Sequence, residues 1–379
     1  TSGNHSTSLR LQFKLELDAN NGYIWKMSEN TSEDISNTSP NLIYTQNYSL
    51  EFVNSNSFED PIVIVDEEDF INMESGENVY YILANDLTLS DYTPLDVNFR
   101  MFDGNGHTIT IQSFDMFGEA EIRAGLFREI YDGMIVANLT VKYDGGRSNA
   151  FGSYSVGNSD FSVTYADLCQ NPDVNYESAD FGGITPVNNG IITNCEVDGM
   201  VALSASTIEN QTDSTSTSNY NIDFNIGGIV SENGASGYIT NSISRLKIFA
   251  QANIGGVAHT NSGKIVSSEF DASTETEDQK TGLIYAYNSN VQNTIISSIA
   301  GFVVTNSGEI SMSNVKVGQT RLGGTSNYIG NMSAKDISAG FVYSNNGSIY
   351  DSYVNLTRIG ANNNTFSGFA NSNSGSISR

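Results

Sequence analysis

The sequence predicts an all-β protein built as a β-solenoid, in which each repeat forms one turn of a long coil. A motif of glycine, an apolar pair, an Asn/Ser/Gly cluster and an alternating apolar segment recurs along most of the chain, most clearly over 299–315. Apolar alternation is typical of strands, and the Asn/Ser/Gly cluster is typical of turns. The repeat is too short for a helix-turn-helix unit, so these features together favour stacked strands.

The glycine that precedes the apolar pair marks each copy of the repeat. The markers are Gly125, Gly183, Gly228, Gly256, Gly282, Gly301, Gly340 and Gly368, and the copy at Gly282 is degenerate. Because the shortest spacing, from Gly282 to Gly301, is 19 residues, we take one turn as about 19–22 residues and the longer spacings as two or three turns. Leucine-rich repeats have a similar period, but their leucine/asparagine consensus is absent.

The repeats also predict what lies inside the coil. The equivalent residues Ile265, Ile310, Ile349 and Ile377 should stack as one apolar ladder, and asparagines at the corners should form polar ladders between turns. The NSG and NNG clusters are expected at corners where glycine and asparagine adopt positive φ.

The N-terminal part of the chain does not carry the repeat. Residues 1–60 hold two strand-like segments, 9–18 and 41–53, and are expected to form a small β cap or the end of a preceding domain. Residues 61–78 are expected to be a linker with a short helix, because the acids that follow Asp66 suit a helix N-terminus. Contiguous acids do not match the alternating ligands of a calcium loop. The coil itself is expected over 79–379.

Three insertions interrupt the repeats, at 145–180, 203–219 and 270–281. They should leave the coil at its corners, because an insertion inside a strand would shift its register. The first contains four aromatic residues that form a candidate glycan-binding surface, with packing against the flank of the coil as the alternative: Tyr154, Phe161, Tyr165 and Tyr176. The last copy stops where its next strand should begin, so the coil is expected to continue beyond 379 or to be covered there.

Composition restricts the partners. The net charge is −26, which argues against nucleic acid, and no apolar stretch is long enough for membrane insertion. Cys169 and Cys195 are predicted to form a disulfide worth about 3 kcal/mol, with two free buried cysteines as the alternative. Six Asn-x-Ser/Thr sequons are candidate glycosylation sites: Asn47, Asn138, Asn210, Asn331, Asn346 and Asn355. These features favour a secreted glycoprotein, extracellular or at the cell surface.

Residues for catalysis are scarce in the sequence. The three histidines, His5, His107 and His259, form no HExxH zinc motif. Polygalacturonase-like hydrolysis needs paired aspartates, a Gly-His-Gly and an Arg-Ile-Lys. Only the last has a counterpart, in Arg245-Leu246-Lys247. We therefore expect no catalytic residues, no metal and no cofactor.

Residues 79–379 resemble a known group of proteins. The segments VYYILANDLTL, FDGNGHTITI and AGLFREIYDGMIVANLTV, followed by Gly-Gly-apolar and Asn-x-Gly repeats, are similar to GLUG-motif surface proteins of bacteria and protists. The resemblance implies a right-handed parallel β-helix of the pectate-lyase-like kind, and it says more about fold than about activity.

These observations predict a non-enzymatic extracellular protein, either adhesin-like or a structural stalk or filament component. It would bind a glycan or a surface protein through its β-helix face and loops, and other chains of a surface assembly or further copies of itself are possible partners. Two alternatives remain open: a polysaccharide-acting β-helix lyase or hydrolase, and a viral tail-spike-like receptor-binding protein.

Overall fold

The fold was obtained as a computed structural model, and the chain divides into two compact units, 1–55 and 56–379. The structure describes residues 13–18, 22–27, 58, 60–114, 122–144, 154–156, 159–161, 178–203, 223–250, 253–272, 283–286, 298–317, 337–356 and 365–379. In the first unit, β1 (Phe13–Asp18) and β2 (Gly22–Met27) pair as an antiparallel hairpin. The predicted strand over 41–53 lies outside the described residues, and the cap role of this unit stays a prediction.

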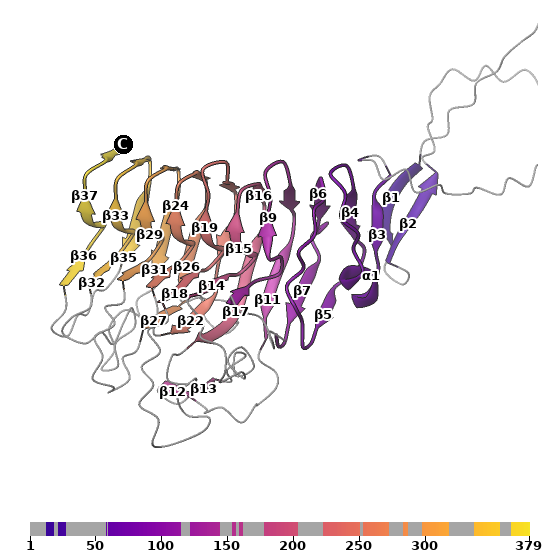
Figure 1. The fold of residues 1–379 in the computed structure, drawn as a ribbon, viewed down its shortest axis with the longest axis horizontal. Helices are drawn as coiled ribbons and strands as arrows, with labels where there is room; N and C mark the ends of the chain where they lie inside the picture. The colour runs from indigo at the N-terminus through magenta and orange to yellow at the C-terminus, as the bar shows by residue number, and fades with distance from the viewer. Residues whose placement is uncertain are drawn as a thin grey trace, which may run out of the picture. The chain divides into compact units, whose positions relative to one another are not determined.

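The second unit is a right-handed parallel β-helix made of four parallel sheets, which confirms the predicted fold class (Figure 1). We number the sheets in the order in which one turn visits them. Sheet 1 contains β8 (Ile122–Ala124), β14 (Ser178–Gly182), β18 (Asp223–Gly227), β23 (Asn253–Gly255), β28 (Ser298–Ala300), β32 (Ile337–Ala339) and β36 (Thr365–Ser367). Sheet 2 contains β9 (Glu129–Ile130), β15 (Thr185–Asn188), β19 (Val230–Asn233), β24 (Ala258–Asn261), β29 (Val303–Asn306), β33 (Val342–Asn345) and β37 (Ala370–Asn373).

Sheets 3 and 4 complete each turn. Sheet 3 contains β3 (Ile62–Ile64), β4 (Tyr80–Leu83), β6 (Met101–Asp103), β10 (Ile135–Ala137), β16 (Ile191–Thr193), β20 (Tyr238–Thr240), β25 (Lys264–Val266), β30 (Glu309–Ser311), β34 (Ser348–Tyr350) and β38 (Ser376–Ser378). Sheet 4 contains β5 (Leu87–Leu89), β7 (Thr108–Ile111), β11 (Thr140–Tyr143), β17 (Glu196–Leu203), β21 (Ile243–Ser244), β26 (Glu269–Ala272), β31 (Asn314–Val317) and β35 (Tyr353–Leu356), with β22 (Lys247–Ala250) and β27 (Leu283–Ala286) beside it.

One turn is longer than the sequence suggested. The four strands β23 to β26 span 253–272, but the chain returns to sheet 1 only at β28, where Ile299 lies opposite Ile254 of β23. The markers Gly256 and Gly301 therefore belong to consecutive turns, and the prediction of a turn of 19–22 residues is wrong. The degenerate copy at Gly282 is not a turn, because its apolar run forms β27, which pairs with β22.

The marker glycines are required for close stacking of the turns. A Cβ on Gly256 would lie 2.1 Å from the carbonyl oxygen of Gly301, and one on Gly308 would lie 2.1 Å from that of Gly263. The glycines of the NSG and NNG corners do not have positive φ. The prediction that these corners need positive φ was therefore wrong, since the close approach of two backbones excludes a side chain there.

The interior is filled by the predicted ladders. Ile265, Ile310, Ile349 and Ile377 stand in register in sheet 3, which confirms the apolar ladder. The rings of Phe302, Phe341 and Phe369 also stack, with centroids 4.6 and 4.7 Å apart. The asparagine ladder is confirmed as well, and each side-chain Nδ2 donates to the next Oδ1 over 2.7 Å along Asn188, Asn233, Asn261, Asn306, Asn345 and Asn373.

The β-helix begins earlier than predicted, inside the segment expected to be a linker. Strand β3 pairs with β4 in sheet 3, so 61–78 belongs to the fold. The predicted short helix is present as α1 (Glu67–Ile71), and the Asp66 carboxylate accepts a hydrogen bond from the Asp69 N–H. Phe70 of α1 is fully buried, 5.8 Å from the ring of Phe102. Phe70 therefore fills part of the interior at the first turns, while the rest of α1 is exposed.

The large length differences between turns lie at one corner of the β-helix, whereas the connections at the other corners vary only from two to four residues. Two residues separate β23 from β24, β24 from β25 and β25 from β26. By contrast, the connection from a sheet 4 strand to the sheet 1 strand of the next turn runs from 143 to 178, from 203 to 223, from 272 to 298 and from 317 to 337. The predicted insertions lie at this corner, although strands enter all three predicted ranges, since β14 begins at Ser178, β17 ends at Leu203 and β26 ends at Ala272.

Candidate functional site

The corner between sheets 3 and 4 carries a row of residues with left-handed backbone geometry. Their φ angles run from 48° to 55° at Asn105, Asn138, Asn194, Asn241, Ser267, Met312 and Asp351. Asparagine is one of the few residues besides glycine that adopts this geometry readily. The first four are all asparagines, and we call them the amide edge. The backbone thus places four amide side chains on successive turns of one corner.

Hydrogen bonds join the amide edge along the axis of the β-helix. The Asn138 Nδ2 donates to Asp103 Oδ1 over 2.9 Å, and the Asn194 Nδ2 donates to Asn138 Oδ1 over 2.8 Å. The Asn105 N–H donates to the same Asp103 oxygen over 2.8 Å. The side chains of Asn194 and Asn241 are exposed. The amide edge is therefore an ordered row that solvent can reach.

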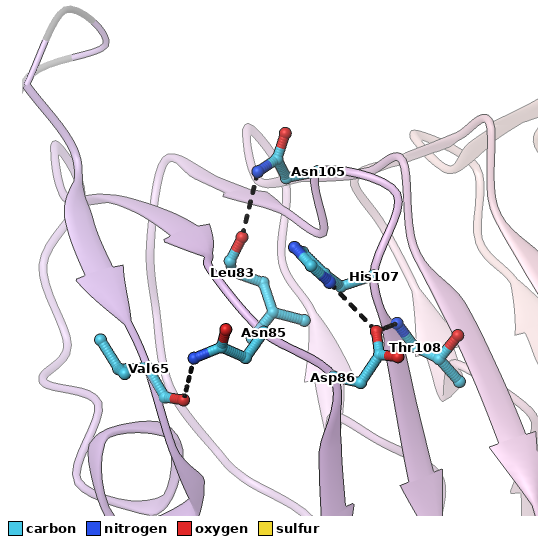
Figure 2. A network of polar contacts seen from close by, with 7 residues as sticks. All are labelled: Val65, Leu83, Asn85, Asp86, Asn105, His107 and Thr108. Carbon is cyan, nitrogen blue, oxygen red and sulfur yellow. Dashed lines mark hydrogen bonds and ion pairs between the residues drawn. The ribbon is translucent and has the colours of Figure 1, made fainter. Parts of the chain in front are cut away.

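The row continues toward the N-terminus as a polar network, shown in Figure 2. The Asp86 Oδ1 lies 3.0 Å from His107 Nδ1 and accepts the Thr108 N–H over 2.9 Å. The Asn85 Nδ2 donates to the Val65 carbonyl over 3.0 Å. These contacts tie neighbouring turns together. His107 thus contacts a residue of another turn.

A hollow of about 220 Å³ opens beside the amide edge. Its lining includes the amides of Asn138, Asn194 and Asn241, together with Thr140 and Glu196. Leu139, whose side chain is buried, also borders it. We call this feature the amide hollow. Its lining residues carry amide, hydroxyl and carboxylate groups, which can donate hydrogen bonds to a polar ligand or accept them from it.

Arg245, which the sequence related to a catalytic Arg-Ile-Lys pattern, is part of a charge row on sheet 4. Its guanidinium pairs with Glu196 and, over 3.2 Å, with Asp271. Partial burial lowers the pKa of Arg245, but its hydrogen bonds and attraction to these two carboxylates exceed that effect, so the pKa is raised overall. A second pair joins Lys316 to Glu269 over 2.7 Å. Arg245 therefore serves to hold three turns together.

Cys195 occupies a position that serine occupies in later turns. Its Sγ lies 3.3 Å from the Thr193 carbonyl, as Ser242 Oγ lies 2.8 Å from that of Thr240. Burial raises the pKa of the Cys195 thiol to about 12. In the structure Cys195 is a free thiol. Cys169 lies outside the described residues, so the disulfide stays a prediction, and the burial of Cys195 counts against it.

The predicted aromatic surface can be placed only in part. Strands β12 (Tyr154–Val156) and β13 (Ser159–Phe161) pair as a hairpin that sets Tyr154 opposite Phe161. Tyr165 and Tyr176 lie outside the described residues. Among the predicted glycosylation sites, Asn47, Asn210 and Asn331 also lie outside them.

The remaining sequons differ in accessibility. Asn346 and Asn355 are exposed, whereas the half-buried Asn138 uses its amide in the ladder of the amide edge. Among the described residues, no cluster of three or more His, Cys, Asp and Glu side chains is placed to hold a metal ion. No helix in the described parts of the chain is long and apolar enough to cross a membrane.

Sequence reasoning missed the amide edge. Asn138, Asn194 and Asn241 each follow a sheet 3 strand directly or after one residue, and they recur once per turn. This recurrence could have been detected in the sequence, but it does not stand out when one turn is assumed to be about 19–22 residues long.

Comparison with known proteins gives little further identification. The chain matches no known family profile, and no curated protein matches it. Among solved structures it is similar to one named "putative immunoglobulin A1 protease" from Bacteroides ovatus, at 15% sequence identity and a TM-score of 0.41, over 86% of this chain and 85% of that chain. A likeness at this level carries no argument about activity, so the fold assignment rests on the strand pairing described above.

Proposed function

We propose that the chain is a non-enzymatic extracellular surface protein, adhesin-like or a structural stalk, whose β-helix is a rigid scaffold for binding loops. The observation that carries the proposal is that the large length differences between turns lie at one corner. Three corners keep a nearly constant length, so the ladders stay in register while the fourth corner accepts segments of different size.

Continuous ladders supply the rigidity that a stalk needs. The asparagine ladder, the phenylalanine stack and the ion pairs of Arg245 each join successive turns. Such contacts resist bending of the coil because every turn is bonded to both neighbours. The resemblance of 79–379 to GLUG-motif surface proteins supports an extracellular location, as do the exposed sequons Asn346 and Asn355.

The proposed ligand is a glycan or a surface protein bound at the variable corner. The segment between β11 and β14 contains Tyr154, Phe161, Tyr165 and Tyr176. Aromatic side chains supply large contact area at low entropic cost, which suits them to recognition of sugars and proteins.

The experiment compares the chain with a variant that carries alanine at all four aromatic positions. Both are applied to an array of immobilised glycans and assayed for released saccharides. We expect binding by the parent chain, weaker binding by the variant at an unchanged melting temperature, and no cleavage. Equal binding by both proteins would remove the aromatic surface from the proposal, and saccharide release would overturn the non-enzymatic assignment.

A further inference from the structure

We propose that the amide edge and its hollow form a second binding site, for an extended, uncharged saccharide chain that runs along the β-helix axis. This site stands apart from the proposed loop site, since it lies at the corner between sheets 3 and 4. It does not depend on the residues tested above.

The first argument is the hydrogen-bonding capacity of the row. A side-chain amide offers two donors and two acceptor positions. Asn138 uses one donor toward Asp103 and one acceptor position toward Asn194. Half of its capacity therefore remains for a ligand, and the exposed Asn194 and Asn241 place further amides on the next two turns. Amides that both donate and accept match sugar hydroxyls, which also do both.

The second argument is spacing. Neighbouring strands in a sheet are about 4.8 Å apart, so the amides repeat at this distance along the axis. Successive rings of an extended pyranose chain are separated by a similar length, and one ring per turn can meet one amide. An extended peptide advances about 3.3 Å per residue, so its residues do not match the spacing of about 4.8 Å between the amides. The repeat therefore favours a saccharide over a peptide.

The third argument is size and charge. The hollow of about 220 Å³ is smaller than the roughly 300–1,000 Å³ of a typical small-molecule site, so it would seat one ring of a longer chain. The Glu196 carboxylate of the hollow is paired with Arg245, but the protein carries a net charge of −26. Acidic saccharides would be repelled by this charge, whereas neutral ones would not.

The test measures binding of linear, β-linked oligomers of glucose, mannose or N-acetylglucosamine, one to six units long, by calorimetry. We expect affinity to rise with length up to three rings, the span from Asn138 to Asn241, and then to level off. Asn194→Gly should weaken binding about tenfold, because it removes the central amide. Glycine accepts the left-handed geometry, so this variant keeps its fold, as its melting temperature will verify.

Two further variants sharpen the result. Asp351→Gly changes the same corner position three turns beyond Asn241 and should leave affinity unchanged. Ser267→Asn adds an amide on the next turn, where φ is already 50°, and should move the plateau from three rings to four. The proposal is overturned if none of the oligomers binds at millimolar concentration, if oligogalacturonates or extended peptides bind more tightly, or if Asn194→Gly and Asp351→Gly behave alike.

Discussion

Replacing Asn261 by alanine should destabilise the β-helix by about 3 kcal/mol. Asn261 is fully buried, accepts from Asn233 Nδ2 and donates to Asn306 Oδ1, each over 2.7 Å. The substitution leaves two buried amide groups without these partners, and each such loss costs about 1–3 kcal/mol. Asn233 retains a second contact with the Gly237 carbonyl at 3.2 Å, so the unpaired Asn306 oxygen should dominate the cost.

The matched control is Asn373→Ala, at the last member of the same ladder. Asn373 is exposed, so water can replace the lost contact and the cost should stay below about 1 kcal/mol. Urea unfolding followed by circular dichroism gives both values from the transition midpoint and slope. If the two substitutions cost the same within about 0.5 kcal/mol, the ladder does not stabilise the interior and the reasoning fails.

Three further predictions follow from single positions. Gly301→Ala should destabilise the protein by more than about 2 kcal/mol, because the added Cβ would lie 2.1 Å from the Gly340 carbonyl oxygen. Gly368→Ala, at the equivalent position of a later turn, places its Cβ in open space and should be nearly neutral in the same urea assay. His259 lies between the positions of Ser231 and Val304, and burial lowers its pKa to about 4. As the pH falls from 6.5 toward 4, the unfolded state binds a proton that the folded state does not, so the free energy of unfolding should fall by up to about 3 kcal/mol. His259→Asn should show a smaller fall over this range. Parallel pH profiles of the free energy of unfolding for the two proteins would contradict the assignment. Cys195 should resist alkylation until the protein unfolds, and Cys195→Ser should change stability by less than about 1 kcal/mol because serine fills this position in later turns. Rapid labelling of the folded protein would show that the thiol is not buried. Recovery of a Cys169–Cys195 peptide on non-reducing mapping would show that it is not free.

The fold class and the interior ladders were predictable because they depend on local pattern. Alternation in segments such as 309–313 indicates strands, and equivalent isoleucines and asparagines must stack once the repeats do. The turn length was not predictable in the same way. The loosely similar segment at Gly282 imitates a repeat, and only the pairing of Ile254 with Ile299 shows that no turn lies between them.

The candidate sites were less visible in the sequence for a related reason. Arg245 had the residue type of a catalytic group, but its role depends on Glu196 and Asp271, which come from other turns. The amide edge likewise brings together Asn138 and Asn194 across 56 positions in the chain. Contacts between distant residues require the register, which composition and spacing alone do not supply.

The most direct test of the scaffold is to shorten the variable corner. Residues 145–177, 204–222 and 318–336 lie between sheet 4 and sheet 1 strands, and each can be replaced by a short Gly/Ser linker in one variant. The account predicts an unchanged β spectrum by circular dichroism, cooperative unfolding and a melting temperature within about 4 °C of the parent chain. A variant that fails to fold, or that unfolds far below the parent, would contradict the claim that the β-helix stands independently of these segments.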